Sequence, residues 1–297
     1  MDHVTAGPDD IATGGLPGCY VLRAPSPQTA ALVVSSPHSG RSYADEFMSV
    51  ARLDEKTLRR SEDSYVDEIF AQSPRLGAPL IAATFPRAFC DVNREAWELD
   101  PAMFEDTLPA WVNTTSPRVG AGLGTIARVV ANGEAIYGIR LRFAEAQRRV
   151  RGYWQPYHDA LAGLVDTTRA RFGMCVLLDC HSMPSGAASA RRPAPDIVLG
   201  DAHGIACDPR VIRCAEQFFT RRGYLTRRND PYAGGYVTRH YGQPRGNVHA
   251  LQIEIARGLY MDEMTLEKRP GFSRVSEDAA DFVSELAGVA GELALLD

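Results

Sequence analysis

Lysine is nearly absent from this chain of 297 residues, in which every basic residue except Lys56 and Lys268 is an arginine. The 32 basic residues are scattered among 37 acidic ones, and the formal net charge is -5. Proteins that bind nucleic acid carry a basic stripe and usually a net positive charge. The charge pattern therefore excludes this class, and we interpret the arginine excess mainly as codon bias of a GC-rich genome.

Long apolar runs are also absent from the sequence. No window reaches 18 consecutive apolar residues, so we predict no membrane span. Residues 1–12 are polar and lack the basic and apolar regions of a signal peptide. We therefore expect a cytoplasmic protein with no membrane partner. The six cysteines include no Cys-x-x-Cys pair, and in a reducing compartment such thiols are mostly buried as small hydrophobic groups.

The apolar residues fall into short runs and helical patterns. The runs predict buried strands at residues 31–36, 79–84, 174–179 and 250–256, and the helical patterns predict helices at residues 61–72, 143–164, 211–219 and 277–296. Pro156 should kink or split the second helix. Strands that alternate with helices predict an α/β domain with a mostly parallel sheet.

Two segments differ from this pattern. Residues 1–30 are rich in Gly, Pro and Asp and predict a loosely packed N-terminal arm before a single catalytic domain at residues 31–297. Residues 95–140 lack clear periodicity, and we interpret them as an insertion or a lid over a site.

Reactive side chains occur at the ends of predicted strands, where α/β sheets bind ligands. His38 follows the first strand, His181 follows the third, and Glu254 lies inside the last one. Zinc prefers imidazole nitrogen and carboxylate oxygen as ligands. Two histidines and a carboxylate could therefore hold one metal ion, with Glu254 as a general base. The alternatives are hydrogen-bonded core histidines and a salt bridge from Glu254 to an arginine.

Residues 85–94 bring together Arg87, Asn93 and Arg94. Arginine can grip a carboxylate through two parallel hydrogen bonds, and asparagine adds a donor. The segment is either a carboxylate-binding element or a surface loop with ordinary ion pairs.

Six motifs together resemble the N-formylglutamate amidohydrolase family over residues 30–265. They are SPHSG (36–40), SEDSYVDEIF (61–70), FPRAFCDVNRE (85–95), LLDCHSMPSG (177–186), YAGGYVTRHYG (232–242) and VHALQIEIARGLYMDE (248–263). The family contains N-formylglutamate deformylases of histidine breakdown and is similar to zinc carboxypeptidases and aspartoacylase-like deacylases. The resemblance implies a three-layer α/β sandwich, in which helices flank a mixed, mostly parallel sheet.

The resemblance also implies that His38 and His181 bind one zinc ion together with an acid. The related hydrolases place this acid three residues after the first histidine, where this chain has Arg41, which cannot bind zinc. We therefore expect the third ligand at Asp63, in the first turn of the helix predicted at residues 61–72. The alternatives are Glu62 and Asp67.

The remaining implied roles concern the reaction and the substrate. Glu254 would act as general base or acid, Arg87 would lie beside the scissile carbonyl, and Arg94 with Asn93 would hold a substrate carboxylate. Asp179 could orient His181, since residues two apart on a strand point the same way. Three further residues would line the pocket, support Glu254 or serve only packing: Tyr236, His240 and His249.

The implied activity is zinc-dependent hydrolysis of N-formyl-L-glutamate, a small N-acyl amino acid, to formate and L-glutamate. One alternative is the same metal-assisted hydrolysis of another N-acyl amino acid or a short peptide. Another is a non-catalytic protein on this fold that binds a carboxylate ligand. The sequence leaves the oligomeric state open.

Overall fold

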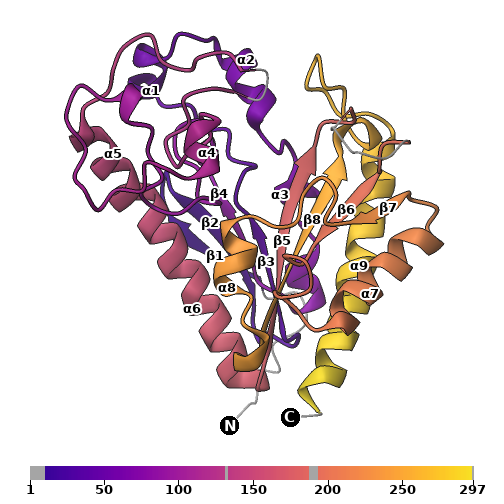
Figure 1. The fold of residues 1–297 in the computed structure, drawn as a ribbon. Coiled ribbons are helices and arrows are strands. Elements are labelled where there is room, and N and C mark those ends of the chain that lie inside the picture. Colours follow the sequence, from indigo (N-terminus) through magenta and orange to yellow (C-terminus); the bar gives the residue numbers. More distant parts are fainter. Residues whose placement is uncertain (1–10, 131–132, 187–192, 296–297) are drawn as a thin grey trace.

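A computed structural model describes residues 11–130, 133–186 and 193–295, and these residues form an eight-stranded sheet (Figure 1). The strand order is β1-β2-β4-β3-β5-β8-β6-β7. Strands β4, β3, β5 and β8 run parallel, whereas β1, β2 and β6 pair in the antiparallel direction with β2, β4 and β8. The strands are β1 (Ile11–Leu16), β2 (Tyr20–Pro25), β3 (Leu32–Ser36), β4 (Leu80–Ala83), β5 (Cys175–Met183), β6 (Ile197–Gly200), β7 (Thr226–Arg228) and β8 (Val248–Ala256). The expected mixed sheet is confirmed.

Helices cover both faces of this sheet, because the central strands are apolar on both sides. In β5, Val176 and Leu178 pack into one core, and Cys175 and Leu177 pack into the other. The first core is closed by α3 (Val66–Ile69), α7 (Pro209–Arg221) and α9 (Gly271–Ala294), and the second by α6 (Gln155–Phe172) and α8 (Tyr236–Tyr241) (Figure 1). Parallel strands buried on both faces are typical of α/β folds. The three-layer sandwich is therefore confirmed.

The long predicted helices form, with one change of helical type. Helix α5 (Phe143–Arg149) continues into α6 through a π-helical turn at Val150–Trp154. Pro156 follows this turn, and a proline ring clashes with the carbonyl four residues earlier in a regular helix. The wider π turn lies where this clash would occur, so the expected interruption is confirmed. None of the helices in the described ranges is long and apolar enough to cross a membrane.

The expected loose arm is wrong for residues 11–25, which form the antiparallel hairpin of β1 and β2. The hairpin extends the sheet because β2 pairs with β4. Most of β1 is exposed, so the strand has no buried face and shows no apolar alternation that would predict it. Residues 1–10 lie outside the described residues.

The expected helix at residues 61–72 is also wrong. Only Val66–Ile69 are helical, as α3, and Tyr65 before them has a φ of 68°, in the left-handed region that ends a right-handed helix. The chain instead leaves the short 3-10 helix η1 (Arg59–Ser61) and turns before α3. Asp63 therefore lies on a loop and not in the first turn of a helix.

Short elements complete the layer above the carboxyl ends of the parallel strands (Figure 1). They include α1 (Asp45–Val50), α2 (Glu55–Leu58) and α4 (Pro117–Gly120). The described parts of the predicted insertion at residues 95–140 bury a small core of their own around Leu99, Phe104 and Ile126. This segment is folded onto the domain, and its movement as a lid stays a prediction.

Candidate active site

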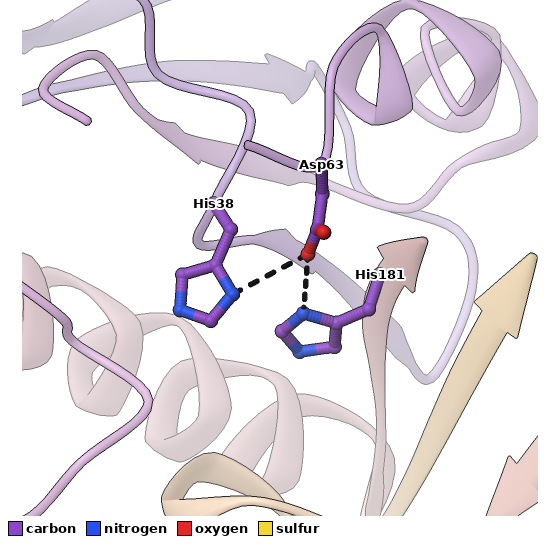
Figure 2. Close-up of side chains that lie close together, drawn as sticks. All are labelled: His38, Asp63 and His181. Carbon is purple, nitrogen blue, oxygen red and sulfur yellow. Dashed lines mark hydrogen bonds and ion pairs between the residues drawn. The ribbon is translucent and has the colours of Figure 1, made fainter. Parts of the chain in front are cut away.

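His38, Asp63 and His181 converge at the carboxyl ends of β3 and β5, and all three are buried (Figure 2). Asp63 Oδ2 lies 2.9 Å from His181 Nδ1 and 3.3 Å from His38 Nδ1. The two histidines meet because β3 and β5 are adjacent parallel strands. The backbone N–H of Asp63 donates to the His38 carbonyl at 3.0 Å, which holds the two loops together.

The outer ring nitrogen of each histidine faces another carboxylate. His38 Nε2 lies 2.7 Å from Asp91 Oδ1, and His181 Nε2 lies 3.0 Å from Asp179 Oδ1. For His38 this contact with Asp91 is a hydrogen bond, and a histidine that donates from Nε2 to a carboxylate keeps the lone pair of Nδ1 for a metal. Both Nδ1 atoms point toward Asp63, so the three donor atoms face one another (Figure 2).

This donor set fits a zinc ion. His38 Nδ1 is buried and has no hydrogen-bond partner, and buried polar atoms in this state call for a ligand. Two atoms that bind one tetrahedral zinc at about 2.0–2.1 Å lie about 3.3 Å apart. The three donors lie within 4.8 Å of one another. Burial alone would raise the pKa of Asp63, but the hydrogen bond with His181 and the nearby ring of His38 hold the pKa well below its usual range, which keeps the carboxylate ionised.

The other two candidate acids lie apart from the histidines. Glu62 accepts hydrogen bonds from Tyr43 Oη at 2.8 Å and Ser64 Oγ at 2.9 Å. Asp67 lies 3.8 Å from Arg41 and lines a separate cavity of about 430 Å³ between β2, β4 and the loop after His38. The structure thus brings only Asp63, of the three acids considered, to the histidines.

Glu254 lies on β8 directly opposite His181 in the parallel register. Its side chain is buried, and Gln252 Nε2 donates to its Oε1 at 2.9 Å. Burial raises the pKa of Glu254 to about 7, although the nearby His181 opposes the shift. A carboxylate with a pKa near neutrality can accept and return a proton at neutral pH.

The His38–Asp63–His181 group lies beside a cavity of about 300 Å³, a size that suits a small molecule. Its charged lining residues are Asp63, Arg87, Asp91, Arg94, Glu254 and Arg257. Leu123, Ala127 and Val129 of the predicted insertion form part of the wall. The predicted insertion therefore contributes to the wall of the site, and its role as a lid stays a prediction.

Two of the arginines differ in how their charge is balanced. Arg87 Nη2 donates to Asp91 Oδ2 at 2.7 Å. Arg94 donates to the carbonyls of Leu123 and Asn93, at 2.8 Å each, and its Nη2 lies 3.9 Å from Asp91 Oδ2. Burial, reinforced by neighbouring guanidinium groups, lowers the pKa of Arg94 to about 10. Arg94 is thus a half-buried cation whose ion-pair partner among the described residues, Asp91, lies beyond hydrogen-bond distance, and this arrangement leaves donors of Arg94 for an anion.

Asn93, Tyr236 and His240 do not line this cavity. The Asn93 side chain is buried, accepts from the backbone N–H of Val237 at 2.8 Å, and places Nδ2 3.1 Å from His181 Nε2. Asn93 therefore contacts His181, a candidate metal ligand, whereas we had expected it to contact the substrate. Tyr236 and His240 stack on each other on α8, with ring centroids 4.8 Å apart.

His249 lies away from the site, which corrects its expected role. It is at the start of β8, five residues before Glu254. The two residues are therefore about 16 Å apart along the strand, and their side chains point to opposite faces of the sheet. Its Nδ1 accepts from the backbone N–H of Asp208, which caps α7. The odd spacing between the two residues already excludes a common face.

Sequence reasoning missed Asp91, Tyr232 and Arg257, all of which line the cavity. Asp91 is an acid in the apolar stretch from Phe89 to Val92, and such a carboxylate is costly to bury without a partner. That signal could have identified it. Tyr232 and Arg257 carry no comparable local signal, because Tyr232 reaches the site from a loop and Arg257 from the short 3-10 helix that follows β8.

Comparisons with known proteins identify the family of this chain. The model of the N-formylglutamate amidohydrolase family matches residues 30–261. The chain belongs to this family. It is 30% identical to an N-formylglutamate deformylase of Pseudomonas putida over 240 residues, which cover 78% of this chain and 82% of the relative. The corresponding protein of Pseudomonas aeruginosa is 29% identical over 236 residues, with the same coverage.

A solved structure of an N-formylglutamate amidohydrolase from Ralstonia eutropha has the same fold. It superposes with a TM-score of 0.88 at 36% identity and covers 93% of this chain and 99% of its own. The resemblance inferred from the motifs is thereby confirmed for both family and fold.

Proposed function

We propose that this protein is a zinc-dependent amidohydrolase that cleaves N-formyl-L-glutamate to formate and L-glutamate. The observation that carries the proposal is the buried His38–Asp63–His181 group. It lies beside a small cavity that Glu254 and Arg94 also line. Family membership and the names of the relatives support the substrate.

Each residue of the site has its own role in the proposed reaction. Bound zinc would supply Lewis acidity, which lowers the pKa of water from 15.7 to about 7 and polarises a carbonyl. Glu254 takes the proton of the attacking water and returns it to the leaving amine. Arg87 lies in the lining where it can donate to the carbonyl oxygen as negative charge develops there.

Arg94, which also lines the cavity, holds a carboxylate of the substrate. Its guanidinium keeps unused N–H donors on Nη2. A non-catalytic binding protein would need this cation but neither Glu254 nor the metal ligands. The cavity is lined by Arg94, Glu254 and Asp63, and Asp63 contacts both histidines, which favours the enzyme.

Metal content and substrate preference test the proposal directly. We expect about one zinc ion per chain in the purified protein, loss of N-formyl-L-glutamate hydrolysis on chelation and recovery on addition of zinc. A panel that includes N-acetyl-L-glutamate and N-formyl-L-leucine separates the acyl group from the amino acid. Full activity of the metal-free protein would contradict the proposal. A higher kcat/KM for another compound of the panel would show that N-formyl-L-glutamate is not the preferred substrate.

Substitution of Arg94 by lysine should raise KM by about 10- to 100-fold, with a smaller change in kcat. Lysine keeps the charge but cannot form two parallel hydrogen bonds with a carboxylate. Steady-state kinetics measure both constants. Arg118→Lys is the matched control, because Arg118 donates to the same Asn93 carbonyl at 3.3 Å but does not line the cavity. An equal KM in wild type and R94K would remove Arg94 from the substrate site.

A further inference from the structure

Arg257 is a buried arginine that joins separate parts of the site. It begins the 3-10 helix η6 (Arg257–Leu259) directly after β8. Its guanidinium donates to Ser182 Oγ at 3.1 Å, to the Arg60 carbonyl at 2.9 Å and to Asp63 Oδ1 at 3.1 Å. It thereby connects β5, which carries His181, with the loop that carries Asp63.

The two carboxylate oxygens of Asp63 have different partners. Oδ1 accepts from Arg257 Nη2 and, at 3.3 Å, from Ser182 Oγ. Oδ2 faces the Nδ1 atoms of both histidines. Because Asp63 lies on a loop, no regular helix or strand fixes its backbone. The contacts of Oδ1 therefore decide which oxygen points to the meeting point of the donors.

We propose that Arg257 is a positioning residue that makes Asp63 a metal ligand through Oδ2 alone and fixes its direction. This inference rests on the proposed function, since it assumes that His38, Asp63 and His181 bind zinc. Partners that hold a metal ligand from behind typically contribute 10- to 100-fold in metal affinity. Loss of Arg257 would leave Oδ1 without its charged partner and let the carboxylate rotate.

The rival role for Arg257 is to bind a substrate carboxylate, because it also lines the cavity. The charge distribution favours the positioning role. Arg257 already has Asp63 as a counter-ion at 3.1 Å, and three of its five N–H donors have protein acceptors. Arg94 has no carboxylate at that distance and is the better anion site.

The test compares Arg257→Met and Arg257→Lys with wild type by titration of zinc against a chromophoric chelator. We expect zinc affinity to fall about 100-fold in R257M and about 10-fold in R257K, because lysine keeps the charge but reaches fewer of the three acceptors. At saturating zinc, KM for N-formyl-L-glutamate should stay at the wild-type value. Arg269→Met is the control, since it breaks an exposed arginine–aspartate pair with Asp262 and should leave zinc affinity unchanged.

Each outcome decides between the roles. Unchanged zinc affinity in folded R257M, with a raised KM, would overturn the positioning role and assign Arg257 to substrate. If R257M does not fold, as judged by circular dichroism, the zinc affinity and KM of R257K are compared with those of wild type instead. Wild-type protein that binds no zinc would overturn the proposed function together with this inference. Zinc binding that is equal in wild type and both variants would overturn the inference alone.

Discussion

Substitution of Glu254 by glutamine should lower kcat for N-formyl-L-glutamate about 10³- to 10⁴-fold. Glutamine keeps the shape of the side chain and its contact with Gln252 but cannot accept a proton, and general acid–base catalysis contributes up to about 10⁴-fold. KM should change little, because the proposed function assigns the substrate carboxylate to Arg94 and not to Glu254. Steady-state kinetics on the zinc-loaded variant provide the measurement.

The informative control for this variant is Glu263→Gln. Glu263 is an acid near the site that accepts from the backbone N–H of Ser185 but does not line the cavity. The variant E263Q should retain wild-type kcat. This result would separate the loss of a specific proton acceptor from the loss of one negative charge. Zinc content should be equal in both variants. A kcat for E254Q within threefold of wild type would exclude Glu254 as the general base.

The central sheet was predictable because its strands are short apolar runs closed by turns. Each of the four predicted strands overlaps an observed one, namely β3, β4, β5 and β8. The hairpin of β1 and β2 escaped prediction, since its order comes from pairing with β4 and not from an apolar face. The helix expected at residues 61–72 failed for a related reason. Its apolar spacing is helical, but Tyr65 adopts a left-handed backbone conformation, and its hydroxyl donates to the distant Leu266 carbonyl, a contact that no local pattern encodes.

The candidate site was predictable where the chemistry follows a strand. His38, His181 and Glu254 were found in this way, because the carboxyl ends of parallel strands meet at one edge. Asp63 was preferred for a helical position that it does not have, although the structure does bring it to the histidines. The contact between Arg257 and Asp63 spans 194 positions of the sequence, and no local pattern encodes it.

Substitution of His181 by alanine should abolish tight zinc binding and lower kcat/KM by at least about 10³-fold. The variant removes a donor atom, whereas loss of an outer hydrogen-bond partner costs about 10- to 100-fold in metal affinity. Asp179→Asn should therefore give the intermediate result, because it leaves Nδ1 of His181 in place and weakens only the contact with Nε2 at 3.0 Å. Metal analysis after dialysis and kinetics at saturating zinc measure both effects.

His240→Ala is the matched control, because His240 is exposed on α8 and stacks on Tyr236 outside the cavity. It should retain both zinc and activity. The ranking of zinc affinity is the decisive result: wild type and H240A should be equal, D179N weaker and H181A weakest. Equal zinc content in H181A and wild type would show that the metal binds elsewhere. A loss of activity in H240A would instead restore that residue to the substrate site.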